Sequence, residues 1–374
     1  HSSVMHHPEN DETYQGLKVE TSPTNPGVIN PYLAVRPRIR KRELSVDEYV
    51  DGILQGNVTI LSRAVTLLES TRPEHEAMAQ QIIEKCLPHS GNSVRIGISG
   101  VPGAGKSTSI DEFGIHVLNT RGGKLAVLAI DPTSERTKGS ILGDKTRMEK
   151  LAVHPKSFIR PSPSSGSLGG VARKTRETIV LCEAAGYSTI FIETVGVGQS
   201  ETACHSMVDF FLLIQVAGTG DELQGIKRGI MEMADGIAIN KCDGDNVERC
   251  KVAAGYYANA LQLFPVPESG IVPKVLTYSG FYGYGIRELW DYIYEYINHV
   301  KQNGYFTRRR QQQNMYWMYE TIDERLRNGF YQDPDISTML HQAETNIENG
   351  KQTSFVAAQS LLEFYFNKLK NNMR

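Results

Sequence analysis

The sequence predicts an α/β fold in which a mostly parallel sheet is covered by helices. From about residue 94 to residue 300, short apolar runs alternate with stretches of helical periodicity, a rhythm typical of parallel sheets. The first apolar run leads directly into a glycine-rich loop, and polar motifs follow several later runs. Ligands of such sheets bind at the carboxyl ends of the strands. The predicted strands are Val94–Ser99, Leu125–Ile130, Thr189–Glu193, Phe210–Gln215, Gly236–Asn240 and Lys274–Tyr278.

The glycine-rich loop after the first strand is the most specific motif. Its sequence, Gly100-Val-Pro-Gly-Ala-Gly-Lys-Ser107, fits the phosphate-binding pattern G-x-x-x-x-G-K-[ST], and a helix is predicted from Thr108 to Leu118. The glycines allow backbone N–H groups to surround a polyphosphate, and the helix start adds partial positive charge. Lys106 would pair with the β- and γ-phosphates, and Ser107 would bind Mg²⁺. The predicted phosphate-binding residues are Gly100, Gly103, Ala104, Gly105, Lys106, Ser107 and Thr108.

A second motif predicts the base of the nucleotide. The apolar strand Gly236–Asn240 runs into Asn240-Lys-Cys-Asp243, which fits N-K-x-D. In P-loop GTPases the aspartate of this motif accepts hydrogen bonds from guanine N1–H and the exocyclic amine. Adenine offers the opposite pattern, so Asp243 predicts a guanine nucleotide. Lys241 would lie along the base, Asn240 would brace neighbouring loops, and Ser279-Gly280 fits a further base-contacting loop.

A third motif, at the end of the strand Thr189–Glu193, predicts a metal and a switch. A carboxylate at Glu193 can hold Mg²⁺ directly or through water, although most P-loop GTPases have aspartate there. The backbone N–H of Gly196 can bind a γ-phosphate, so that its loop senses hydrolysis. Gln199 in the same loop is a candidate for positioning the attacking water, and is equally well explained as a polar loop residue.

Two further acids are candidate Mg²⁺ ligands. Asp131 follows a predicted strand, and Asp144 lies in a polar, glycine-containing stretch downstream of it. Oxygen donors suit Mg²⁺, although single acids of this kind are more often helix caps or salt-bridge partners. The predicted metal-binding residues are Ser107, Asp131, Asp144 and Glu193.

Composition argues against several other classes. The chain of 374 residues carries 40 basic and 42 acidic side chains, so bulk binding to nucleic acid is not expected. No apolar run approaches the roughly 18 residues of a membrane span, so no membrane association is expected. The five cysteines are scattered and form no C-x-x-C pair. Neither a disulfide framework nor a zinc site is therefore predicted, and a reducing compartment fits best.

Four parts are predicted along the chain. Residues 1–43 are polar and are expected to form a mobile tail. Residues 44–90 are expected to be helical, because Ser45-Val-Asp-Glu48 fits a capping box before an apolar-periodic segment. Residues 91–304 contain the motifs. Residues 305–374 have helical periodicity and more apolar surface than a lone hairpin buries, which favours a dimer or partner interface over packing on the rest of the chain.

Together these motifs resemble the MeaB/ArgK-like P-loop GTPases, the chaperones of adenosylcobalamin-dependent methylmalonyl-CoA mutase that include the cobalamin A-type protein. The resemblance begins near residue 45 and is strongest over residues 94–245. Residues 1–40 lie outside it, so the basic run Arg36–Arg42 has no assigned role. The matching strings are Gly100–Ser107, Asp131–Ser134, Gly139–Met148, Ile159–Pro163, Leu168–Val171, Glu193–Ser200 and Asp221–Gly229.

The resemblance implies a slow Mg²⁺-dependent GTPase that forms GDP and phosphate. The mutase would accelerate hydrolysis, which would gate cofactor loading and protect or reactivate the mutase. Residues 216–227 would be a further switch that places Lys227 near the nucleotide. The C-terminal helices would form a homodimer, and the protein would be cytoplasmic in a bacterium or in the mitochondrial matrix of a eukaryote. The candidate catalytic residues are Lys106, Glu193, Lys227 and Gln199.

The same motifs leave other functions to be weighed. A chaperone of a related acyl-CoA mutase would carry the same residues. A typical ATP-using kinase has no need of the guanine-selecting Asp243. A nickel-delivery GTPase usually carries a His-rich stretch or a Cys-x-Cys pair near its switch, and this sequence has neither. The motifs therefore favour a GTPase that regulates a partner enzyme.

Overall fold

The computed structural model describes residues 42–101, 103–132, 148–163, 167–195, 199–218 and 228–374. The predicted tail, residues 1–43, lies almost wholly outside these ranges. Contacts group Val46–Arg374 into one compact unit, separate from His1–Ser45. The finer predicted boundaries near residues 90 and 304 stay a prediction.

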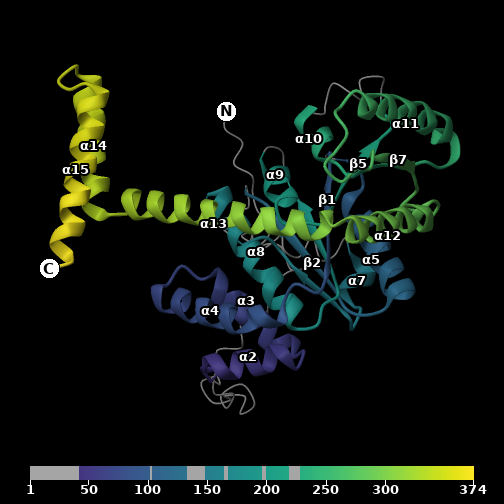
Figure 1. Cartoon of the computed structure of the whole chain (residues 1–374), viewed down its shortest axis with the longest axis horizontal. Coiled ribbons are helices and arrows are strands. Elements are labelled where there is room, and N and C mark those ends of the chain that lie inside the picture. Colours follow the sequence, from purple (N-terminus) through teal and green to yellow (C-terminus); the bar gives the residue numbers. More distant parts are fainter. Residues whose placement is uncertain (1–41, 102, 133–147, 164–166, 196–198, 219–227) are drawn as a thin grey trace, which may run out of the picture. The chain divides into compact units, whose positions relative to one another are not determined.

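A parallel sheet forms the centre of the compact unit. Its strands are β1 (Val94–Gly100), β2 (Leu125–Ile130), β3 (Ser157–Arg160), β4 (Thr189–Thr194), β5 (Phe210–Val216), β6 (Gly236–Asn240) and β7 (Lys274–Thr277). The strand order is β3-β2-β4-β1-β5-β6-β7, and each neighbouring pair is parallel (Figure 1). This arrangement confirms the predicted α/β fold class.

Helices cover the sheet (Figure 1). Further helices precede the first strand and follow the last strand in the sequence. On the amino-terminal side of the P-loop lie α2 (Val46–Leu54), α3 (Val58–Glu69) and α4 (Pro73–Cys86). Among the strands lie α5 (Lys106–Arg121), α7 (Glu149–Ala152), α8 (Leu168–Ala184), α9 (Ser200–His205), α10 (Arg228–Met233) and α11 (Val247–Gln262). The carboxyl-terminal helices are α12 (Ile286–Asn303), α13 (Tyr305–Tyr331), α14 (Pro334–Glu348) and α15 (Ser354–Asn372).

Strand β1 is buried on both faces because helices pack against each of them. Ile96 belongs to an apolar cluster with Phe113 of α5 and Trp290 of α12. On the opposite face α9 approaches so closely that a Cβ on Gly97 would lie 2.7 Å from the Sγ of Cys204. Continuous apolar strands of this kind are typical of parallel sheets covered on both sides.

The amino-terminal helices pack on α8 and are tied to the edge of the sheet. Asn57 accepts a hydrogen bond through Oδ1 from the backbone N–H of Ile60, which caps the start of α3. Arg160 of β3 donates to both carboxylate oxygens of Glu69, at 3.2 and 2.9 Å. This paired contact joins the end of α3 to β3.

Strand β3 is not among the strands that the apolar pattern predicts. It has four residues, only Phe158 of which is buried, and it lies at the sheet edge. An edge strand of this length carries little apolar pattern, and a charged residue such as Arg160 is common at an edge.

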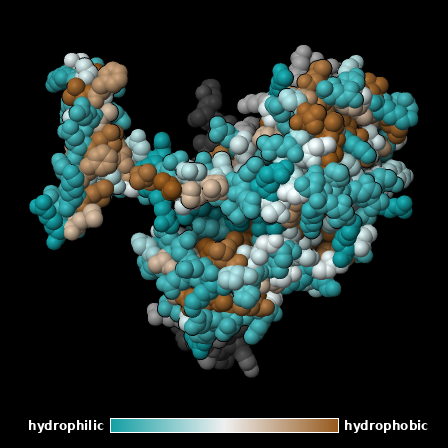
Figure 2. Space-filling view, viewed as in Figure 1, coloured by the Kyte–Doolittle hydropathy of each residue, from teal (hydrophilic) through white to brown (hydrophobic). Residues whose placement is uncertain are grey.

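Helix α13 begins beside the amino-terminal ends of β5 and β6. The rest of α13, together with α14 and α15, forms a helical arm. Arg309 pairs with Asp235 at 3.0 Å, and Arg310 pairs with Asp209 at 2.8 Å. Trp317, further along, donates through Nε1 to the carbonyl of Ser206 at 3.1 Å. Figure 2 shows hydrophobic surface on the end of α13 and on the α14–α15 hairpin. In the part of the chain that the structure describes, no helix is long and apolar enough to cross a membrane.

Candidate functional site

The motifs of the sequence meet at one edge of the sheet. Because the strands are parallel, their carboxyl ends lie side by side. Strand β1 leads into the glycine-rich loop, and β4 beside it carries Glu193 opposite Ile98. Strand β2, on the other side of β4, places Ala129 opposite Glu193, two residues before Asp131. The ends of these three strands therefore form the phosphate and metal half of the candidate site.

Gly105 determines how the glycine-rich loop closes. Its φ of +76° lies in the left-handed region that favours glycine. A Cβ at this position would also lie 2.8 Å from the Nδ2 of Asn240. Gly105 is the N-cap of α5, whose first residue is Lys106. The loop therefore brings the amino end of a long helix to the strand ends, an arrangement suited to binding an anion.

Lys106 connects this loop to the end of β4. Its Nζ donates to the carbonyl oxygen of Thr194, the residue after Glu193. The hydroxyl of Thr194 donates to the Oγ of Ser99 at 2.9 Å, which ties β4 to the end of β1. The ammonium group thus lies between the glycine-rich loop and the start of the predicted switch.

Oxygen donors for a metal come from three elements around the loop. Ser107 is in the first turn of α5. Glu193 is buried with 5% of its surface exposed, and Asp131 is held through its backbone N–H by the Oγ of Ser162 at 2.9 Å. No group of three His, Cys, Asp or Glu residues that could hold a metal occurs among the described residues. These donors fit Mg²⁺, which commonly uses one or two carboxylates together with substrate phosphates and water.

The remaining predicted site residues fall into two groups. Asp144, Gly196 and Lys227 lie outside the described residues. Gln199 is described, is exposed and is the N-cap of α9. Thr108 is exposed in the first turn of α5.

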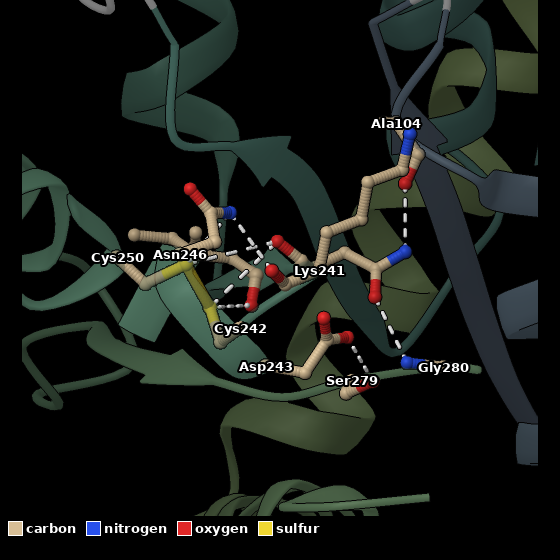
Figure 3. Close-up of a disulfide and its surroundings, with 10 residues drawn as sticks. Ala104, Lys241, Cys242, Asp243, Asn246, Cys250, Ser279 and Gly280 are labelled. Atoms are coloured by element: carbon tan, nitrogen blue, oxygen red, sulfur yellow. Dashed lines mark hydrogen bonds between the residues drawn. A yellow bond between two sulfur atoms is a disulfide. The ribbon is translucent and has the colours of Figure 1, made fainter. Parts of the chain in front are cut away.

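Asn240 joins the phosphate half of the site to the base half, through the partners Ala104 and Gly280 that Figure 3 labels. Its Nδ2 donates to the carbonyl of Ala104 at 2.8 Å, and its Oδ1 accepts from the backbone N–H of Gly280 at 2.9 Å. The side chain is 4% exposed. Because both ends of the amide are bonded, the two loops are held in a fixed relation.

Lys241 and Asp243 follow on the same loop. Lys241 has a φ of +62°, and its Nζ donates to the carbonyl of Gly103 at 2.8 Å. Asp243 accepts a hydrogen bond through Oδ2 from the hydroxyl of Ser279 at 2.7 Å (Figure 3). All the residues predicted to contact the base are therefore brought together with the P-loop.

Two further residues of this network are not predicted from the sequence. Ser109 is fully buried, and its Oγ lies 2.7 Å from the hydroxyl of Tyr278 and 3.2 Å from Asn240 Nδ2. Burial raises the pKa of Tyr278, so the phenol stays protonated and neutral. The only signal for Ser109 is its place two residues after the motif serine.

The cysteines require a correction. Cys242 and Cys250 form a disulfide, whereas the scattered spacing predicted none (Figure 3). Their Cα atoms lie 5.7 Å apart, a usual separation for a disulfide. The 3₁₀ turn Gly244–Asn246 reverses the chain and α11 then begins, so the fold brings the two residues together. A spacing of eight residues matches no recognised cysteine pattern, so the disulfide is not predictable from the spacing.

A family model described as "Methylmalonyl Co-A mutase-associated GTPase MeaB" matches residues 61–335. The chain belongs to this GTPase family. The match confirms the resemblance found in the sequence and the prediction that the protein is a P-loop GTPase.

Relatives and a solved structure agree with membership of the MeaB family. A probable GTPase of Mycobacterium tuberculosis is 47% identical over 321 residues, covering 85% of this chain and 95% of the relative. The mitochondrial methylmalonic aciduria type A homolog of Mus musculus is 42% identical over 335 residues, covering 87% of this chain and 80% of that protein. A crystal structure titled LAO/AO transport system kinase is 36% identical, with a TM-score of 0.68, and covers 86% of this chain and 98% of its own.

Proposed function

We propose that this MeaB-family GTPase is a Mg²⁺-dependent switch for adenosylcobalamin-dependent methylmalonyl-CoA mutase. It would hydrolyse GTP to GDP and phosphate, and hydrolysis would gate cofactor loading and protect or reactivate the mutase. The observation that carries the proposal is the family match over residues 61–335. The name of the mouse relative, which refers to methylmalonic aciduria, also supports it.

The glycine-rich loop would hold the phosphates. Backbone N–H groups of Gly103–Thr108 would surround them, and the Nζ of Lys106 would move from the Thr194 carbonyl to the β- and γ-phosphate oxygens. This exchange would release Thr194, which precedes the predicted switch. Binding of the γ-phosphate would thereby be linked to the loop that carries Gly196 and Gln199.

The oxygen donors around the loop would hold the metal. Ser107 would bind Mg²⁺ directly, and Asp131, Asp144 and Glu193 would bind it directly or through water. When bound, Mg²⁺ would withdraw charge from the transferring phosphoryl group. Catalysis by the chain itself would consist of positioning and charge stabilisation, with Lys106 and, after partner binding, Lys227 as the cations.

The base half would select guanine. Asp243 would accept from N1–H and the exocyclic amine of the base, while the Ser279 hydroxyl keeps the carboxylate oriented. The loop Ser279-Gly280, which is held against Asn240 through the backbone N–H of Gly280, would line the base pocket beside Asp243. The aliphatic part of Lys241 would cover one face of the base.

The partners would be the mutase and a second copy of the chain. The exposed apolar side chains of α13 and α15 support a homodimer formed through the arm. A related acyl-CoA mutase is the alternative partner. The compartment would be the cytoplasm of a bacterium, or the mitochondrial matrix if the source is a eukaryote.

The test measures GTP turnover by the full chain with and without purified methylmalonyl-CoA mutase. We expect slow turnover alone, faster turnover with the mutase, and co-elution of the two proteins on gel filtration. Absence of both stimulation and a complex would overturn the partner assignment. Stimulation by a related acyl-CoA mutase alone would redirect it to that enzyme.

Lys106→Ala supplies the matched control for this experiment. Because the Lys106 ammonium group is expected to contact the phosphates, the variant should lose nucleotide binding and turnover in both conditions. Circular dichroism would check that the fold persists. Tight GTP binding by the folded variant would contradict the P-loop assignment.

A further inference from the structure

The disulfide lies inside the motif that is proposed to recognise guanine. Cys242 stands between Lys241 and Asp243, and Cys250 is in the first turn of α11 (Figure 3). The bond closes a short ring of backbone that contains Asp243 and the 3₁₀ turn Gly244–Asn246. Any change in this bond therefore acts on the loop that holds the base.

We propose that Cys242 and Cys250 form a reversible redox modification site whose state sets the rate at which guanine nucleotide leaves the protein. The site would be opened by thiol reductants and closed by small-molecule or protein disulfides. The proposed effect on the rate of nucleotide release rests on the proposed recognition of guanine by Asp243. The presence of the disulfide does not depend on that proposal.

Exposure directs reagents to this pair and to one of its two sulfurs. Cys242 is half-buried, whereas Cys250 is 1% exposed. The three remaining cysteines, Cys86, Cys182 and Cys204, are fully buried. Burial raises the pKa of Cys86 to about 11 and raises those of the other two further, so their reactive thiolate forms are scarce. Cys242 is therefore the accessible point of attack.

Both redox states fit the local structure. The Sγ of Cys242 lies 3.1 Å from the carbonyl oxygen of Ile239, and the Sγ of Cys250 lies 4.0 Å from that of Asn240. In the dithiol state these oxygens can accept weak S–H hydrogen bonds. When the disulfide opens, each thiol therefore already has a carbonyl oxygen nearby as a hydrogen-bond acceptor.

The surroundings of Cys250 favour exchange. The Nδ2 of Asn246 donates to the Sγ of Cys250 at 3.6 Å. Cys250 also lies near the amino end of the long helix α11, whose partial positive charge favours the negative charge that develops on this sulfur as it leaves. The Cys250 sulfur is therefore the leaving group when an external thiolate attacks Cys242.

The exchange balances without a further reagent. To close the site, the Cys242 thiolate attacks a disulfide, forms a mixed disulfide and releases one thiolate. The Cys250 thiolate then attacks the Cys242 sulfur and expels the second. Two protein thiols are oxidised and one external disulfide is reduced to two thiols. Opening is the reverse, with an external thiol as reductant.

Hydrogen bonds transmit the state of the bond to the base-binding residues. Asn246 donates through Nδ2 to the carbonyl of Lys241 at 2.8 Å, and its backbone N–H donates to the carbonyl of Asp243 at 3.0 Å. With the disulfide closed, this turn is tied at both ends. Opening it gives the loop more conformational freedom, so release of bound nucleotide becomes easier.

Peptide mapping tests the bond independently of nucleotide. Trypsin cuts after Lys241, Arg249 and Lys251, so the peptides Cys242–Arg249 and Cys250–Lys251 stay joined only through the disulfide. After treatment of the full chain with oxidised glutathione, we expect the joined peptides, and after dithiothreitol the separate ones. Separate peptides in both conditions would overturn the proposal.

Release of a fluorescent GDP analogue tests the consequence. We expect release from the reduced chain to be about fivefold faster than from the oxidised chain, because loosened binding acts mainly through the dissociation rate. Cys250→Ser should release at the fast rate in both conditions, and Cys86→Ala should keep the redox difference. Equal release from mapped oxidised and reduced wild-type chains would overturn the redox effect. Absence of GDP binding in both states would instead contradict the proposed guanine site, while the peptide map would still report the disulfide.

Discussion

At the scale of single residues, the candidate site depends on side chains that hold one another. Asn240 bonds the P-loop at Ala104 and the base loop at Gly280, and Ser279 orients the carboxylate of Asp243. The carboxylate proposed to read the base is thus oriented by a side chain of the protein itself. Preorganisation of this kind makes the choice of base sensitive to one atom.

Asp243→Asn should change that choice. The substitution replaces one carboxylate oxygen, a hydrogen-bond acceptor, by an NH₂ group, which is a donor. GTP should therefore bind about 10- to 100-fold more weakly, while xanthosine triphosphate gains affinity. Competition against a fluorescent nucleotide measures both. Asp245→Asn, an exposed acid two residues away, is the control and should leave the preference unchanged. An unchanged preference in Asp243→Asn would count against guanine recognition by this residue.

Sequence patterns predict those residues whose chemistry is tied to a fixed spacing. Lys106, Asn240 and Asp243 belong to motifs, and the structure brings them to one edge of the sheet. Ser109 belongs to none, because its role depends on the distant segment that the fold brings beside it. Cys250 belongs to none because its separation of eight residues from Cys242 fits no recognised spacing.

At the scale of secondary-structure elements, α13 ties the arm to the sheet. Arg310 donates to both oxygens of Asp209, each at 2.8 Å, and Asp209 also accepts from the backbone N–H of Arg95. Gln313, one turn later, donates to the carbonyls of His205 and Val208. The helix therefore bonds the end of α9, which begins in the predicted switch region.

Arg310→Ala should destabilise the chain by about 3 kcal/mol, because it leaves the buried carboxylate of Asp209 without its charged partner. Urea unfolding followed by circular dichroism measures the free energy of unfolding. Gln311→Ala, an exposed neighbour on the same helix, should stay within about 0.5 kcal/mol of the parent. Equal stability of the two variants would show that the ion pair does not hold α13.

His205, the last residue of α9, should make stability fall with acid. Burial and the positive charge of Arg309 lower the pKa of His205, whereas the negative charge of Asp235 raises it. The net result is a pKa lowered from 6.5 to about 4. The unfolded chain therefore binds this proton at a higher pH than the folded chain. The contribution is complete above about pH 6.5 and is lost as the pH falls towards 4, amounting to about 3 kcal/mol.

Urea unfolding at several pH values between 4 and 7 measures this loss. His205→Gln should reduce the dependence of unfolding free energy on pH over that window. His341→Gln, an exposed histidine of α14, should leave the slope unchanged. The same slope in both variants would refute the role assigned to His205.

Element prediction succeeds where an element is long and strongly patterned. Strands β2 and β6 have the predicted bounds, since continuous apolar runs mark buried parallel strands. Strand β3 is not predicted, whereas β7, an edge strand of the same length, is. The contact of α13 with the amino-terminal ends of the strands is also not predictable from the sequence. Arg309 and Arg310 have the pattern of solvent-exposed charges, and only the fold shows that they pair with Asp235 and Asp209.

At the scale of the whole molecule, the arm exposes more apolar surface than a chain in water usually leaves uncovered. Phe355 is 87% exposed and Leu326 is 68% exposed. On α15, Phe355, Leu362 and Phe366 recur at helical spacing and so share one face. Figure 2 shows hydrophobic surface on this hairpin. A second copy of the chain is the proposed cover.

Phe355→Glu should therefore dissociate the homodimer. A charge within an apolar contact cannot be buried without a partner except at a cost of several kcal/mol, so the apolar face of α15 should no longer associate with a second copy. Gel filtration with light scattering gives the mass directly. Asn367→Glu, at an exposed position about 120° around α15 from Phe355, adds the same charge outside the apolar face and should stay dimeric. GTP turnover without the mutase should persist in both variants, because the arm contributes no described residue to the nucleotide site.

Two outcomes would contradict this prediction. A Phe355→Glu chain that keeps the mass of a dimer would place the interface elsewhere, and a parent chain of monomeric mass would refute the homodimer itself.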